Sequence, residues 1–184
     1  MICRFLLISG SLRDDSTNAA VLRTVRAVAP DCVTCDLYDG VGRLPHFNPD
    51  HDHDPLPAAV ADLREAVHRS DAIVFSTPEY AGALPGSLKN LLEWLIGDDQ
   101  HGSIYEKPVA WINASPRGAV LAHESLRTVL AYAKATVIEA ALFEIPVTPA
   151  ALGADGLVSD PDARDALRQL ARTLSGTVCS ARPV

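Results

Sequence analysis

Runs of consecutive apolar residues constrain the fold of this chain more than any other feature. Phe5-Leu6-Leu7-Ile8 is one such run, and Ala72-Ile73-Val74-Phe75 and Val109-Ala110-Trp111-Ile112 are two more. A strand with one face in water alternates apolar and polar residues, whereas a strand covered on both faces does not. The runs therefore predict strands of a parallel sheet that carries helices on both sides.

Segments with helical spacing separate these strands. Val21, Val25 and Val28, for example, fall on one face of a helix. The expected strands are 3–9, 33–38, 71–76, 108–114 and 136–141, and the expected helices are 18–29, 56–69, 85–96, 120–134 and 160–176. This regular alternation is typical of an α/β protein, and 184 residues suit one domain, which we expect to span 1–184.

Charge and hydropathy exclude several kinds of partner. The chain has 16 Lys and Arg against 23 Asp and Glu, a formal net charge of −7, and no basic stripe. Nucleic acid is therefore not an expected partner. No apolar run approaches the ~20 residues of a membrane helix, and the first run is too short for a signal peptide. We expect no membrane partner and a cytoplasmic location.

The four cysteines, Cys3, Cys32, Cys35 and Cys179, are sparse and irregularly spaced for a disulfide framework. Cys32 and Cys35 form a C-x-x-C pair, but they fall on a predicted strand, where positions three apart face opposite sides. We therefore expect neither a redox dithiol nor a zinc half-site at this pair.

Two histidine-containing stretches also suggest sites, and we interpret both as structural. His51-Asp52-His53-Asp54 lies in a proline-rich loop without a further ligand at metal spacing, so we expect it to be solvated and no metal to bind. His123 and Glu124 begin a predicted helix, where we expect them to cap the helix or to face solvent.

The loops that follow the strands are the places to search for a ligand site, because open parallel sheets bind ligands outside the carboxyl ends of their strands. The first loop, 9–18, has only Gly10, so it matches neither a dinucleotide fingerprint nor a P-loop. It combines hydroxyls, Arg13 and a helix start, which are the parts of a monophosphate site. The same hydroxyls would also suit a helix cap at Ser16 or Thr17.

The second and third loops add different chemistry at the same edge. Loop 77–86 holds two prolines and two glycines around Tyr80, which suits a flat heteroaromatic ring that backbone groups approach closely. The alternative is a tight turn in which Tyr80 covers the edge of the core. Loop 115–118 contributes a hydroxyl and a second cation, Arg117.

These loops resemble those of the NAD(P)H-dependent FMN reductases, a family of flavodoxin-like proteins that includes quinone, azo-dye and chromate reductases. The resemblance rests on Gly10-Ser11-Leu12-Arg13-x-x-Ser16-x-Asn18 and on the stretch from Pro78-Glu79-Tyr80 through Pro85-Gly86-Ser87-Leu88-Lys89-Asn90 to Glu93-Trp94. It implies a three-layer sandwich whose five-stranded parallel sheet has the strand order 2-1-3-4-5.

The residues that the resemblance assigns to FMN share the three strand-end loops. They are Ser11, Arg13, Ser16 and Asn18 for the phosphate, Pro78, Glu79, Tyr80, Ala81 and Gly82 for the isoalloxazine ring, and Ser115, Arg117 and Gly118 for its other edge. No catalytic side chain is implied, because the flavin carries the chemistry. The family usually has Asn after the Tyr, where this chain has Ala81.

The implied function is hydride transfer from NADPH or NADH, through non-covalently bound FMN, to a quinone, free flavin or similar small acceptor. The resemblance also implies a homodimer or homotetramer, for which an exposed apolar helix end at Trp94, Leu95 and Ile96 would suit the interface. One alternative is a flavodoxin-type carrier that binds FMN without nicotinamide turnover. Another is a flavin-binding structural or regulatory protein that has lost turnover.

Overall fold

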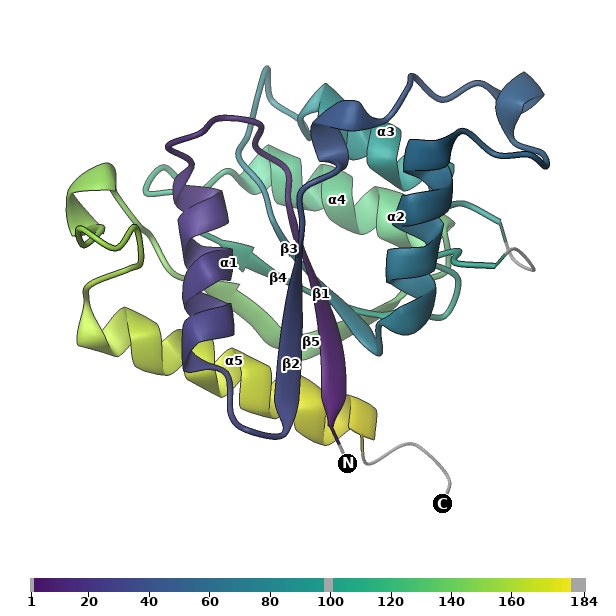
Figure 1. Cartoon of the computed structure of the whole chain (residues 1–184). Coiled ribbons are helices and arrows are strands. Elements are labelled where there is room, and N and C mark those ends of the chain that lie inside the picture. Colours follow the sequence, from purple (N-terminus) through teal and green to yellow (C-terminus); the bar gives the residue numbers. More distant parts are fainter. Residues whose placement is uncertain (1, 98–100, 180–184) are drawn as a thin grey trace.

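The computed structural model describes residues 2–97 and 101–179, and these form a five-stranded parallel sheet with helices on both faces (Figure 1). The strands are β1 (Cys3–Ser9), β2 (Val33–Tyr38), β3 (Ala72–Ser76), β4 (Pro108–Asn113) and β5 (Thr136–Glu144), in the order β2-β1-β3-β4-β5. The helices are α1 (Thr17–Val28), α2 (Ala58–Arg69), α3 (Gly86–Trp94), α4 (Val120–Tyr132) and α5 (Pro161–Cys179). The predicted flavodoxin-like fold and strand order are confirmed. Within the described ranges, no helix has the length and apolar character needed to cross a membrane.

Both faces of the inner strands β1, β3 and β4 are largely buried, which explains their uninterrupted apolar runs. Phe5 and Leu7 of β1 belong to the core that α1 and α5 cover, whereas Leu6 and Ile8 belong to the core beneath α2, α3 and α4. Because side chains of a strand alternate between its faces, a strand between two helix layers needs apolar residues at every position.

Strand β5 is longer than the sequence predicted. Its pairing with β4 is irregular: Val109 lies opposite Val137, but Trp111 lies opposite Leu142. Residues 138–141 therefore bulge out of the ladder, and pairing resumes after the predicted end at 141. The other strands and the helices agree with the predicted ranges to within a few residues at their ends.

The loop between β2 and α2 contains a buried ion pair, which corrects the expectation of a solvated stretch at Asp52 alone, since His51, His53 and Asp54 are exposed as predicted. Asp52 is 14% exposed, and its Oδ1 accepts a hydrogen bond from Arg64 Nη2 at 2.6 Å. The Arg64 guanidinium also donates to the carbonyl oxygen of Trp94. Asp52 is thus a structural partner of α2, because a buried guanidinium requires a counter-charge.

The end of α3 is buried as well, so the predicted exposed apolar helix end is wrong. Trp94 and Leu95 are both fully buried, and Ile96 packs partly buried against the same core. The Trp94 indole donates to the carbonyl oxygen of Pro45, and its ring meets Phe47 edge-on at 5.0 Å. Large apolar residues that do lie exposed are Ile2, Leu12, Tyr80, Val120, Leu121 and Tyr132.

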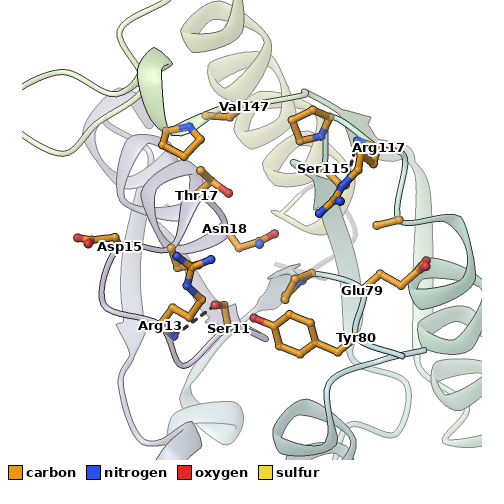
Figure 2. Close-up of a pocket in the computed structure, with 15 residues that line it drawn as sticks. Ser11, Arg13, Asp15, Thr17, Asn18, Glu79, Tyr80, Ser115, Arg117 and Val147 are labelled. Atoms are coloured by element: carbon orange, nitrogen blue, oxygen red, sulfur yellow. Dashed lines mark hydrogen bonds between the residues drawn. The ribbon is translucent and has the colours of Figure 1, made fainter. Parts of the chain in front are cut away.

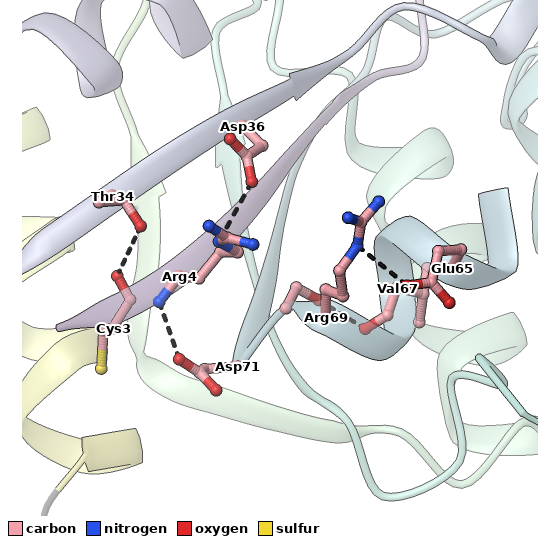
Figure 3. A network of polar contacts seen from close by, with 9 residues as sticks. Cys3, Arg4, Thr34, Asp36, Glu65, Val67, Arg69 and Asp71 are labelled. Atoms are coloured by element: carbon pink, nitrogen blue, oxygen red, sulfur yellow. Dashed lines mark hydrogen bonds and ion pairs between the residues drawn. The ribbon is translucent and has the colours of Figure 1, made fainter. Parts of the chain in front are cut away.

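A set of polar contacts and a disulfide hold the amino ends of the strands together. Figure 3 shows Arg4 of β1 between Asp36 of β2 and Asp71. The Arg4 Nε lies 3.4 Å from the Asp36 carboxylate, and the Arg4 backbone N–H donates to the Asp71 carboxylate at 2.8 Å. Cys3, at the start of β1, forms a disulfide with Cys179 at the end of α5. The irregular cysteine spacing did not predict this disulfide, because the two residues meet only in the folded chain.

The C-x-x-C cysteines are free thiols, with Cys32 in the turn before β2 and Cys35 within that strand. Cys32 is exposed, whereas Cys35 is half-buried. Burial raises the pKa of the Cys35 thiol to about 12, and the neighbouring Asp36 carboxylate adds to this increase. Cys35 is therefore a protonated, weakly nucleophilic thiol at neutral pH.

Candidate functional site

A cavity of about 650 Å³ opens at the carboxyl edge of the sheet, between the loops that follow β1, β3, β4 and β5 (Figure 2). Its volume lies within the ~300–1,000 Å³ that is usual for small-molecule and cofactor sites. The predicted site residues that line it are Ser11, Arg13, Ser16, Asn18, Pro78, Glu79, Tyr80, Ser115 and Arg117. The structure thus brings together side chains from all three loops that the sequence singled out.

The first loop turns tightly against the second. A Cβ atom on Gly10 would collide with the side chain of Thr77, the residue that follows β3. Glycine is therefore required here for close packing between the loops. Close packing of the two loops therefore explains Gly10, the single glycine of loop 9–18, without reference to a ligand.

Two predicted phosphate residues have their side chains partly committed to the fold. Ser16 is the N-cap of α1, and its Oγ accepts a hydrogen bond from the Ala19 backbone N–H at 3.3 Å, so the helix-cap interpretation is confirmed for Ser16. The buried Asn18 lies with its Oδ1 2.9 Å from the Ser76 hydroxyl, which donates to it. The Arg13 backbone N–H donates to Ser11 Oγ at 3.3 Å, so the Ser11 hydroxyl can face a ligand chiefly as a donor. The Thr17 hydroxyl and the remaining N–H groups at the start of α1 are the other groups that can face a ligand.

Two unpaired guanidinium groups face the cavity from opposite walls. Figure 2 shows Arg13 on the side of α1 and Arg117 on the side of β4. Among the described residues, neither guanidinium has an ion-pair or hydrogen-bond partner. The Asp15 carboxylate, by contrast, is turned outward from the loop in Figure 2. The other lining carboxylate, Glu79, accepts the Ala122 backbone N–H, so the four charges sum to zero and the positive charge open to a ligand is local to the two guanidinium groups.

The loop after β3 contains a two-residue turn that presents Tyr80. The backbones of Tyr80 and Ala83 exchange two hydrogen bonds of 3.1 Å each. The central residues, Ala81 and Gly82, have φ angles of +52° and +70°, the left-handed pair that a type I′ turn requires. Ala81 and Gly82 thus shape the turn and do not line the cavity.

The loop after β4 is fixed by Asn113, the last residue of that strand. The Asn113 amide donates to the carbonyl oxygen of Gly118, and its Oδ1 accepts the backbone N–H of Ser115 at 3.1 Å. Gly118 and Ala119 both have positive φ, +88° and +43°. Gly118 contributes to a second cavity on the far side of this loop and not to the first.

Several lining residues were missed by the sequence analysis. They are Asp15, Thr17, Pro116, Ala119, Val147 and Pro149. Val147 and Pro149 follow β5, so the rule that ligands bind at the carboxyl ends of strands would have indicated them, had it been applied to the fifth strand. Asp15 and Thr17 were within the first loop but carried no distinguishing motif.

His123 is a further residue that the structure places differently from the expectation. It is 8% exposed, although the sequence predicted a cap or a solvent-facing side chain. Its Nδ1 lies 2.8 Å from the carbonyl oxygen of Ala119, one turn earlier. The side chain is buried because it points from α4 toward Trp111 of β4, whose ring centroid is 6.1 Å away.

The strand order and the cavity at the carboxyl ends of the strands define a flavodoxin-like α/β protein. A sequence profile described as NADPH-dependent FMN reductase matches residues 3–149, and the chain belongs to this family.

Individual relatives agree with this assignment. The chain is 31% identical over 173 residues to an NAD(P)H-dependent FMN reductase of Pseudomonas aeruginosa, covering 93% of this chain and 92% of the relative. It is 36% identical over 116 residues to a quinone reductase of Pseudomonas putida, covering 62% of this chain but only 60% of the relative. The structure of FerB, a flavoenzyme NAD(P)H:(acceptor) oxidoreductase from Paracoccus denitrificans, superposes with a TM-score of 0.77 and 26% identity, covering 97% and 98% of the two chains.

Proposed function

We propose that this protein is an FMN-dependent oxidoreductase that passes hydride from NAD(P)H, through bound FMN, to a quinone, free flavin or similar small acceptor. The observation that carries the proposal is the cavity itself, which combines the unpaired Arg13 beside the start of α1 with Tyr80 from the loop after β3. The relatives described as quinone and FMN reductases support the same reaction class.

The donor set fits the phosphate end of FMN. A phosphate group at the start of α1 would receive hydrogen bonds from backbone N–H groups and from the Ser11 and Thr17 hydroxyls. Arg13 would add a charge-assisted bond and neutralise part of the phosphate charge. Ser16 and Asn18 would support this end by holding the first turn of α1 in place.

The ring end of FMN would lie between the loops after β3 and β4. Pro78 and Tyr80 offer flat apolar surface on one side, and Tyr80 is 47% exposed before any ligand covers it. Ala81 and Gly82 would fix the direction of Tyr80 through their turn, and Glu79 would anchor that loop to α4. Ser115 and Arg117 would border the other edge of the ring, and Gly118 would act on that edge only by shaping their loop.

When bound, FMN supplies the group that accepts hydride from the nicotinamide and delivers electrons to the acceptor. This chain's own contribution is electrostatic and geometric. The Arg117 guanidinium would place positive charge at the ring edge and so favour a negatively charged reduced ring. The open side of the cavity leaves room for a nicotinamide or a flat acceptor to stack in turn.

The decisive experiment combines FMN titration with nicotinamide turnover. Quenching of flavin fluorescence by the purified protein would measure FMN binding, and loss of NADPH or NADH absorbance with a soluble quinone would measure turnover. Binding with quinone-dependent oxidation of either nucleotide supports the proposal. Binding without oxidation of NADPH or NADH would favour a flavodoxin-type carrier, and no FMN binding would overturn the proposal altogether.

We further propose that residues 1–184 act as one FMN-binding domain in the cytoplasm and assemble as a homodimer or homotetramer. Tyr80 and Leu121 lie exposed beside each other, since the Leu121 side chain comes within van der Waals distance of a Cβ built on Gly82. This patch replaces the α3 end as our proposed interface. Sedimentation of the wild type and of Leu121→Glu tests it: the variant should shift toward the monomer mass.

A further inference from the structure

Arg117 is the cation that the proposed flavin site leaves without an anionic partner. FMN carries one phosphate group, which the proposed function places beside Arg13, and its oxidised ring is uncharged. Among the described residues, Arg13 and Arg117 are the only Lys or Arg side chains that line the cavity, and they lie on opposite walls (Figure 2). The Arg117 guanidinium has no ion pair or hydrogen bond within this part of the chain. The cavity can therefore accept a second anionic group at the Arg117 wall.

The loop that carries Arg117 is fixed by hydrogen bonds at both ends. The buried Asn113 side chain donates to the Gly118 carbonyl oxygen and accepts the Ser115 backbone N–H at 3.1 Å. Within the loop, the Gly118 N–H donates to the Ser115 carbonyl oxygen at 3.1 Å, and the Arg117 N–H donates to Ser115 Oγ at 3.2 Å. The backbone of Arg117 is thus ordered before a ligand arrives, which lowers the entropy cost of binding through its side chain.

The start of α4, next in the chain after this loop, offers little to an anion. Glu79 Oε2 already accepts the Ala122 backbone N–H there at 3.1 Å. A carboxylate at a helix start offsets the positive end of the helix dipole and repels a second anion. Charge recognition on this wall of the cavity therefore depends on Arg117 alone.

Arg43 differs from Arg117 in both respects that matter, although it is also exposed. Its Nη2 lies 2.9 Å from Asp39 Oδ1, so its charge already has a partner. It does not line the cavity. Arg43 therefore provides a matched control, because its removal changes the net charge of the chain by the same amount as removal of Arg117.

The nicotinamide dinucleotide is the substrate that always brings an anionic group. Quinones and similar acceptors can be uncharged, whereas NADPH and NADH both contain a pyrophosphate, and NADPH adds a 2′-phosphate. A guanidinium can form two parallel hydrogen bonds to a phosphate group, a geometry that a lysine ammonium lacks. The chain has no G-x-G-x-x-G fingerprint, so a glycine-rich backbone cradle of that kind does not compete for the phosphate.

We propose that Arg117 binds a phosphate group of the nicotinamide dinucleotide, and that Asn113 is a positioning residue that holds the loop from which Arg117 extends. Arg117 would thus set the affinity for the dinucleotide and, where its partner is the 2′-phosphate, the preference for NADPH over NADH. The inference rests on the proposed function, because it requires a flavin site that NAD(P)H enters.

Unreactive analogues measure this binding without turnover. Tetrahydro-NADPH and tetrahydro-NADH do not transfer hydride, so their dissociation constants can be measured on the FMN-loaded protein from the change in flavin absorbance. We expect Arg117→Ala to weaken the binding of tetrahydro-NADPH by about tenfold, the effect of one charge-assisted contact at an exposed position. A loss confined to tetrahydro-NADPH identifies the 2′-phosphate as the partner, and an equal loss for both analogues identifies the pyrophosphate. Arg43→Ala should change neither dissociation constant.

Two further variants separate charge from geometry. Arg117→Lys keeps the charge but loses the planar fork, so it should lose part of the affinity. Asn113→Ala should weaken the same analogue about threefold in the wild-type background and not at all beside Arg117→Ala, because a positioning residue acts only through the side chain that it positions. Added salt should weaken analogue binding more in the wild type than in Arg117→Ala.

Unchanged affinity for both analogues in Arg117→Ala, with FMN still bound, would overturn the inference and leave the proposed function intact. An equal loss in Arg43→Ala would also overturn it, since net charge alone would then explain the effect. Additive losses in the double variant would refute the positioning role of Asn113. Failure of the wild type to bind FMN would remove the proposed function and this inference together, and FMN titration before each analogue titration distinguishes that case. If Asn113→Ala fails to fold, the exposed Arg117→Ala still decides whether Arg117 binds the dinucleotide.

Discussion

Glu79 Oε2 lies 3.1 Å from the backbone nitrogen of Ala122 and accepts its hydrogen bond. This bond joins the loop after β3 to the first turn of α4, where unpaired N–H groups and the helix dipole favour a carboxylate. Two walls of the proposed flavin cavity are thereby held at a fixed separation by one side chain.

Replacement of Glu79 should loosen that connection. We expect Glu79→Ala to lower the free energy of unfolding by ~0.5–1 kcal/mol, since a partly exposed carboxylate at a helix start contributes about that much. Glu79→Gln keeps an acceptor and should lose less. Urea denaturation measures the change, and Glu124→Ala, which removes an exposed carboxylate from the same helix, is the control. If Glu79→Ala and Glu124→Ala lowered the free energy of unfolding equally, the loss would come from the change in net charge and not from the bond to Ala122.

Arg13 should act on the phosphate of FMN and on nothing else in the cofactor. We expect Arg13→Ala to weaken FMN binding by ~1.5–3 kcal/mol, or roughly 10- to 150-fold, because it removes one charge-assisted hydrogen bond. Riboflavin lacks the phosphate, so its affinity should stay unchanged. Fluorescence titration of both flavins measures this difference. A similar loss for riboflavin would place Arg13 beside the ring instead of the phosphate.

Ala81 occupies a backbone conformation that suits other residues better. A non-glycine residue in the left-handed region costs about 1–2 kcal/mol, and Asn and Gly tolerate that region best. We therefore expect Ala81→Asn and Ala81→Gly to raise the melting temperature, by an amount equivalent to ~0.5–1 kcal/mol. Ala83→Gly is the matched control, since Ala83 has no positive φ and should lose stability. A loss of stability in Ala81→Asn would refute the I′-turn explanation.

The Cys3–Cys179 disulfide should contribute measurably to stability, because it closes a loop with a sequence separation of 176 residues. We expect Cys179→Ser to lower the free energy of unfolding by ~2–4 kcal/mol. A reducing agent should have the same effect on the wild type and none on the variant. Cys32→Ser, at an exposed free thiol, should change little. Two free thiols in the unfolded, non-reduced protein are expected, and four would mean that the disulfide does not form in solution.

His123 should make stability depend on pH in a defined direction. Its pKa in the folded protein is lowered, chiefly by burial, so the unfolded chain binds a proton more readily than the folded one. The stability that neutral His123 contributes is fully present above a pH of about 6.5, the pKa of histidine in an unfolded chain. It is lost as the pH falls below that value. Urea denaturation from about pH 7.5 to about pH 5.5 should show this decline, and His123→Gln should flatten it. An unchanged slope in the variant would assign the decline to other groups.

The sheet could be predicted from the sequence because its signals are local. The apolar runs in β1, β3 and β4 reflect burial on both faces, and each is contained within a few consecutive residues. The end of β5 was not predictable in the same way, because its bulge depends on how Val137 and Leu142 pair with a strand elsewhere in the chain.

In the candidate site, too, the residues with a local sequence signal could be predicted, and those that depend on distant partners could not. The cavity residues of the first three loops follow from one rule about strand ends, combined with a motif that lies within each loop. The burial of His123 and Asp52 and the pairing of Cys3 with Cys179 depend instead on partners distant in sequence: Trp111, Arg64 and the end of α5. Composition and spacing do not reveal such partners, which are seen only in the folded structure.

The ion pair, the backbone hydrogen bond and the disulfide that hold β1 in place lie at the amino ends of the strands, and the cavity lies at their carboxyl ends. Residues that select a ligand can therefore change over evolutionary time without weakening the contacts that secure the sheet. A lineage with this architecture is free to exchange one electron acceptor for another through a few substitutions in loops. Divergence among such proteins should accordingly concentrate at one end of the molecule.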